Sequence, residues 1–70
     1  MVVEIFRTNI SNDIQAADVL DNLYKQFPGY KINFDLDDCD NILRIEAFEI
    51  VEHKIKQIVN ERGFLCEVII

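Results

Sequence analysis

A chain of 70 residues is long enough for one small domain with a single modest core. Half of its residues are hydrophobic and 29% are charged, which is ordinary for a soluble globular domain and excludes a low-complexity segment. The formal net charge of −6 opposes binding to nucleic acids and to anionic membranes, because both kinds of partner require a cationic face. Composition therefore favours one acidic globular unit over residues 1–70.

The N-terminal residues MVVEIFRTN include an acid and lack the apolar stretch of a signal peptide. No apolar run approaches the ~20 residues of a membrane-spanning helix. The two cysteines, Cys39 and Cys66, are too few for a disulfide framework. We therefore expect a reducing, cytoplasmic location.

The first half of the chain predicts a strand followed by a helix. Residues 2–8 are rich in β-branched and aromatic side chains, which is typical of a strand. Asn12 is a good N-cap for the helix, and Gln15 would complete an Asn version of the capping box. Pro28 ends the helix. Its apolar stripe comprises Ala16, Val19, Leu20, Leu23 and Phe27.

Strict alternation over residues 30–36 predicts a second strand whose inward side chains are Tyr30, Ile32, Phe34 and Leu36. A polar turn over residues 37–41 joins it to a third strand over residues 42–47, so the two form a hairpin. The opposite side of these strands is polar and is expected to form an open sheet face with cross-strand charge pairs. That set is Lys31, Asn33, Asp35, Arg44, Glu46 and Glu67.

A second helix is predicted over residues 51–62, with Gly63 at a left-handed C-cap. Its apolar stripe comprises Val51, Ile55, Ile58 and Val59. Residues 64–70 alternate again and predict a fourth strand, with its inward side chains at Phe64, Cys66, Val68 and Ile70.

The element order is therefore βαββαβ. Each helix has one apolar stripe and the hairpin has one apolar face. The simplest burial places both helices on one side of a four-stranded antiparallel sheet, which is the α+β ferredoxin-like sandwich. Right-handed crossovers would put the first and third strands in the centre and the second and fourth at the edges.

Several local stretches together resemble one family. Residues 6–10, Phe-Arg-Thr-Asn-Ile, are similar to its first strand and the exit from that strand, with Ile10 where the family usually has Met. Asp35-Leu36 and residues 40–43 are similar to its second strand and hairpin, and residues 62–64 to its Gly-aromatic turn. Over nearly all of its length the chain resembles the heavy-metal-associated (HMA) domain of small copper chaperones and metal-pumping ATPases.

The resemblance implies a C-x-x-C pair at the start of the first helix, whose thiolates hold Cu(I) or Zn(II). Asn12 and Gln15 stand at those two positions in this chain. Amides are poor ligands for soft ions, so we expect these positions to cap the helix without binding metal. The expectation is a degenerate member of the family with no cofactor, and Cu(I) or Zn(II) binding is the alternative.

Other candidate residues are weaker. Cys39 lies in an acidic cluster formed by Asp35, Asp37, Asp38 and Asp40. Their D-x-D-D-x-D spacing lacks the glycine and distal glutamate of a calcium loop, so a solvated turn is favoured. Cys66 is expected in the core and His53 on the surface. No motif of a nucleotide-binding loop, a zinc protease or a serine hydrolase occurs, so we expect a non-enzymatic protein.

The leading hypothesis is a protein-interaction or structural module with an unidentified protein partner. Retained metal handling, including a route through Cys39, is the first alternative. Small-ligand sensing at an oligomer interface is the second alternative, and it rests on fold analogy. A homodimer could form through an edge strand, for which residues 68–70 are favoured because they are apolar on both faces.

Overall fold

The computed structural model describes residues 1–37 and 39–69. Asp38, and the inward position expected for Ile70, lie outside the described residues. The elements follow the expected order: β1 (Val2–Thr8), α1 (Asp13–Gln26), β2 (Lys31–Asp35), β3 (Ile42–Ala47), α2 (Glu52–Glu61) and β4 (Cys66–Val68). Within the described residues, neither helix is long and apolar enough to cross a membrane.

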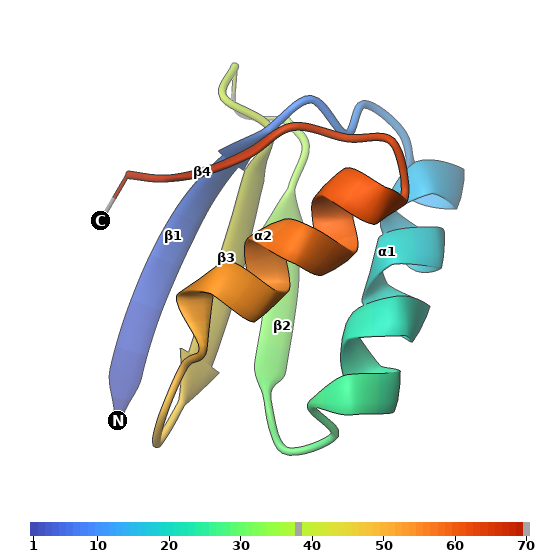
Figure 1. The fold of residues 1–70 in the computed structure, drawn as a ribbon. Coiled ribbons are helices and arrows are strands. Elements are labelled where there is room, and N and C mark those ends of the chain that lie inside the picture. Colours follow the sequence, from blue (N-terminus) through green and yellow to red (C-terminus); the bar gives the residue numbers. More distant parts are fainter. Residues whose placement is uncertain (38, 70) are drawn as a thin grey trace.

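The four strands form one antiparallel sheet in the order β2-β3-β1-β4. Both helices cover the same face of that sheet (Figure 1). Helix α1 connects β1 to β2, and α2 connects β3 to β4, so each helix crosses over a strand that lies between the two strands it joins. The predicted ferredoxin-like sandwich is confirmed, with β1 and β3 in its centre.

The apolar stripes of both helices meet the inward side of the sheet and form one core. Its fully enclosed members are Phe6, Ile10, Val19, Leu23, Leu43, Ile45, Ile55 and Val59. Leu20 and Phe27 complete the α1 stripe as partly buried side chains. The prediction for Val51 was wrong in one respect, because this residue is the half-buried N-cap of α2 and precedes the helix.

The last strand is shorter than predicted. β4 covers three residues, and residues 64–65 enter it without strand pairing. Val68 was expected to be buried like Cys66, but 36% of it is exposed. The physical reason is its position, since β4 lies at the edge of the sheet and pairs with β1 alone.

The open face of the sheet carries the expected mixture of charges, but the ion pairs differ from the prediction. Arg44 and Glu46 interact at 2.6 Å along β3 itself instead of across strands. Arg7 of β1 lies 3.3 Å from Asp40, so this ion pair joins the central strand to the hairpin turn. Both pairs are partly solvated, and each contributes less than about 1 kcal/mol.

Tyr30 connects the two halves of the fold. Its ring stacks on Phe27 with the ring centroids 4.5 Å apart. Its hydroxyl accepts a hydrogen bond of 3.0 Å from the backbone N–H of Val51. Because no side chain of its own caps α2, this phenol satisfies a backbone donor at the start of that helix.

Replacing Tyr30 by Phe keeps the stacked ring and removes only the hydroxyl. We expect Tyr30→Phe to lower the free energy of unfolding by about 0.5–1.5 kcal/mol, because the Val51 N–H loses its partner. Urea denaturation measures the change. Tyr24→Phe is the matched control, since Tyr24 is 38% exposed, and it should leave the midpoint almost unchanged. Equal losses in the two variants would contradict this role for Tyr30.

Candidate functional site

The candidate site is the junction between β1 and α1, residues 9–15. Thr8 fixes its entrance: the hydroxyl of Thr8 donates to the carbonyl of Asn41 at 2.6 Å and accepts from the N–H of Ile10 at 3.1 Å. Ile10 has no exposed surface and anchors the loop in the core. Asn41 has φ 49°, a left-handed conformation that asparagine tolerates, so the hairpin turn can present its carbonyl here.

Two further contacts attach the junction to the second half of the chain. The side-chain oxygen of Asn9 accepts a 2.8 Å hydrogen bond from the N–H of Leu65, just before β4. The guanidinium of Arg62 donates to both carboxylate oxygens of Asp18 at 2.8 and 2.9 Å, which joins α1 to the end of α2. The segment entering β4 accordingly runs past the start of α1 (Figure 1). The loop is therefore held from both sides.

The two positions predicted from the resemblance both take part in the helix cap. The Oδ1 atom of Asn12 accepts the N–H of Gln15 at 2.9 Å. The Oε1 atom of Gln15 accepts the N–H of Ser11 at 2.9 Å and the hydroxyl of Ser11 at 3.2 Å. Gln15 therefore reaches back to Ser11 and not to Asn12, one residue earlier than a standard capping box predicts.

These hydrogen bonds decide what the junction can do chemically. The oxygen of each amide already accepts a hydrogen bond from the protein, and the two NH₂ groups are donors, which do not ligate metal cations. Soft ions such as Cu(I) prefer thiolate sulfur. Among residues 1–37 and 39–69, no group of three or more His, Cys, Asp or Glu side chains is placed to hold a metal ion. The junction is therefore a helix N-terminus that is closed by its own capping hydrogen bonds.

The cysteines and the acidic turn do not assemble a second site in the part of the chain that the structure describes. Cys39 is an exposed free thiol, and Cys66 is a buried one. Burial raises the pKa of Cys66 to about 12, which keeps this thiol protonated and a poor metal ligand. Asp37 is exposed, and Asp40 interacts with Arg7.

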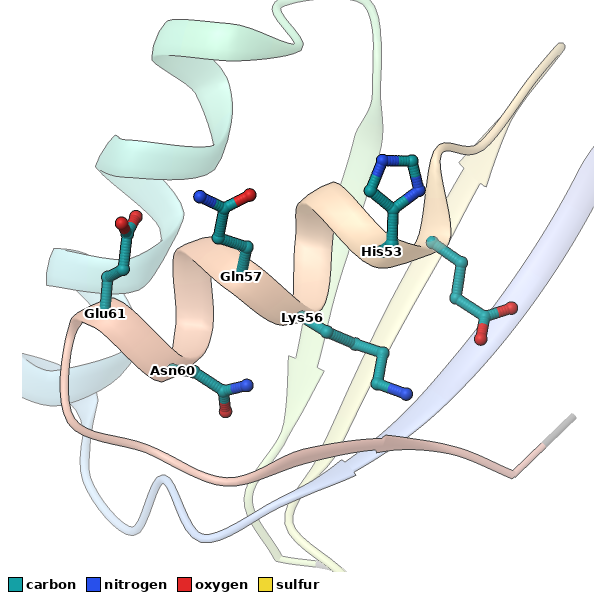
Figure 2. Close-up of a pocket in the computed structure, with 6 residues that line it drawn as sticks. His53, Lys56, Gln57, Asn60 and Glu61 are labelled. Atoms are coloured by element: carbon teal, nitrogen blue, oxygen red, sulfur yellow. The ribbon is translucent and has the colours of Figure 1, made fainter.

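His53 lies on a shallow surface along α2 (Figure 2). His53, Gln57 and Glu61 project from one side of the helix, and Lys56 and Asn60 project from the other. Every residue that lines this surface belongs to the same helix, so no second element encloses a ligand. His53 itself is exposed, as expected from the sequence.

The sequence reasoning missed Glu4. In β1 it shares the inward side with Phe6 and Thr8, and its Oε2 atom is buried without a hydrogen-bond partner among the described residues. Loss of hydration raises the pKa of Glu4, and the carboxylate of Glu52 raises it further. Counting back two residues from the buried Phe6 would have found this inward acid.

The sequence reasoning also missed the exposure of two apolar side chains at the junction. Ile14, on the first turn of α1, is 85% exposed, and Leu65, whose N–H binds Asn9, is 64% exposed. Phe48 is 88% exposed at the other end of the sheet, next to Ala47, which pairs with Val2. For Ile14 the signal was present, because it lies off the apolar stripe of its helix.

The comparisons with known proteins give the fold. No family model matches the chain, and no curated protein sequence matches it. Among solved structures, the chain is similar to the yeast copper transporter domain Ccc2a, which was determined in the apo and Cu(I)-loaded states. The TM-score is 0.79 at 18% identity, and the match covers 97% of this chain and 94% of that one. This likeness extends over the whole ferredoxin-like sandwich.

Glu4 gives a prediction about pH. A carboxyl group whose pKa is raised by folding weakens the folded state above that pKa, and the loss disappears as the pH falls. We expect Glu4→Gln to raise the free energy of unfolding at pH 7, because the variant removes the charge that folding disfavours. The gain should vanish well below pH 4.5, the ordinary value for this group, because Glu4 is then neutral in both states.

Denaturation of Glu4→Gln at several pH values measures this effect. Glu49→Gln is the matched control, since Glu49 is exposed in the loop before α2. A gain for Glu4→Gln that persists unchanged at low pH would show that packing, and not the buried charge, is responsible.

Proposed function

We propose that this protein is an HMA-like domain that has lost the thiolate metal site and acts as a protein-interaction module. The observation that carries the proposal is the use of both amide oxygens, those of Asn12 and Gln15, as acceptors within the helix start. In the HMA family, which the chain resembles, the same two positions supply thiolates to the metal. Here their side-chain oxygens accept hydrogen bonds from Ser11 and Gln15 of the protein itself.

Metal binding by the wild-type junction would be doubly unfavourable. Turning Asn12 toward an ion would release the N–H of Gln15 and cost about 1 kcal/mol of cap stability. The ion would gain at most two amide oxygens, whereas Cu(I) and Zn(II) select sulfur or imidazole. The free energy lost at the cap is therefore not recovered from the ion.

The surroundings of the junction support a role in binding protein. Ile14 and Leu65 expose apolar side chains on two segments that meet at Asn9. Each of these two side chains would bury apolar surface if a partner covered it. The net charge of −6 favours a protein partner that is neutral or basic on the contacting face.

The metal part of the proposal is tested by restoring the thiolates. Asn12→Cys combined with Gln15→Cys places two thiols at the N-terminus of α1, where the helix lowers thiol pKa values. We expect this double variant to bind one Cu(I) in competition with a chromophoric chelator, and the wild type to leave the chelator saturated. The double variant should also lose about 1 kcal/mol of stability in the metal-free state.

Two results would contradict that part. If the wild type competed for Cu(I) as well as the double variant, the junction would be a metal site after all. If wild-type competition disappeared in Cys39→Ser, the ion would be held through the exposed thiol of the hairpin turn.

The interaction part is tested by partner capture from the native cell. We expect the wild type to recover the same protein with Cu(I) added or with metal chelated. Ile14→Ser and Leu65→Ser should each reduce recovery at least about tenfold if each buries its side chain in the contact. Phe48→Ser, at the opposite end of the sheet, should not. Recovery that depends on metal, or that is insensitive to Ile14 and Leu65, would overturn this part.

A further inference from the structure

The outer edge of β2 is the longer of the two free edges of the sheet. β2 covers the five residues Lys31–Asp35 and pairs on one side only, with β3. In Figure 1 it forms the border of the sheet opposite β4. An edge strand presents unpaired backbone N–H and C=O groups, which can accept a further strand.

The sequence of β2, Lys-Ile-Asn-Phe-Asp, is complementary to itself when read in the opposite direction. Antiparallel pairing of two copies about Asn33 places Lys31 of each copy opposite Asp35 of the other. It also places Ile32 opposite Phe34. Directly opposed residues lie close enough to interact, and opposite charges there are favourable. One register therefore satisfies two ion pairs and two apolar pairs.

Exposure agrees with this register. Lys31, Asn33 and Asp35 are exposed on the open face. Phe34 faces the core side but is only half-buried. β3 covers one flank of this side chain, and the flank toward the edge of the sheet is left open. A second copy of β2 would bring Ile32 against that free flank, so pairing would bury apolar surface as well as backbone.

The alternative edge is less suitable. β4 has three residues, and antiparallel pairing of two copies about its central Glu67 would place two carboxylates opposite each other. Like charges in directly opposed positions are destabilising. The expectation that residues 68–70 form the dimer edge stays untested, and the pairing of charges favours β2.

We propose that a second copy of this chain binds through β2, in the antiparallel register centred on Asn33, and forms one continuous eight-stranded sheet. A two-fold axis perpendicular to the sheet keeps the helices of both copies on the same face. Pairing of two five-residue strands buries less surface than ~1,200 Å², the lower limit of a standard interface. The association is therefore weak and appears at high protein concentration. The contact uses neither Asn12 nor Gln15, so this proposal is independent of the proposed function.

Charge exchange tests the register. We expect wild-type protein to show a reversible monomer–dimer equilibrium by sedimentation at concentrations up to about 1 mM. Lys31→Asp and Asp35→Lys should each raise the dimer dissociation constant at least about tenfold, because each change places like charges together at two symmetric positions. Lys54→Asp is the charge-matched control on the exposed face of α2, and it should dimerise like the wild type.

Recombining the charges distinguishes this register from any other contact. An equimolar mixture of Lys31→Asp and Asp35→Lys should form a heterodimer, and the double variant carrying both changes should dimerise by itself. Circular dichroism verifies that each variant is folded. A wild type that stays monomeric throughout, or single variants that dimerise like it, or a mixture that stays monomeric would each overturn the proposal.

Discussion

The start of α1 is closed by hydrogen bonds between its own side chains and backbone, and the function that we propose depends on that closure. Asn12 and Gln15 each use their side-chain oxygen to satisfy backbone N–H groups that no helical partner can reach. Thr8 and Ile10 hold the strand exit in place beneath the cap. In the function that we propose, a junction whose amide oxygens accept these hydrogen bonds does not bind a soft metal ion. The same backbone with thiolates at residues 12 and 15 would offer two sulfur ligands to such an ion.

In this proposal, fold and function are determined by different residues. The sandwich is specified by alternation in the strands and by one apolar stripe on each helix, which many sequences can supply. The likeness to a yeast copper transporter domain at 18% identity shows how little of the sequence the fold requires. In our proposal, function depends on Asn12 and Gln15 at the junction, where the chain differs from the C-x-x-C pair of the HMA family that it resembles. Fold alone therefore does not carry the copper chemistry over to this protein.

Much of the architecture could be predicted from the sequence because buried positions recur at a spacing that differs between helices and strands. Ala16, Val19 and Leu23 repeat at helical spacing, and Ile32 and Leu43 alternate within a hairpin, so element order and strand order followed. The length of β4 did not follow, because Val68 has the right residue type for a strand interior but lies at an edge with one neighbour. The cap residues were predictable from local chemistry. The contact of Tyr30 with Val51 depends on which elements pack together, and no local pattern encodes that. The inward position of Glu4 follows from strand alternation two residues before Phe6, and the structure adds that its Oε2 atom has no hydrogen-bond partner among the described residues.

The most direct test of the closed junction is an amide NMR titration of the reduced, ¹⁵N-labelled wild-type domain with Cu(I) and then with Zn(II). The N–H groups of Ser11 and Gln15 report on the two capping bonds themselves. A closed cap predicts that both signals keep their positions and their rates of exchange with solvent when metal is added in the low micromolar range. Saturable shifts centred on residues 9–15, with faster exchange at Ser11 and Gln15, would show that the junction opens to bind metal and would contradict the central claim.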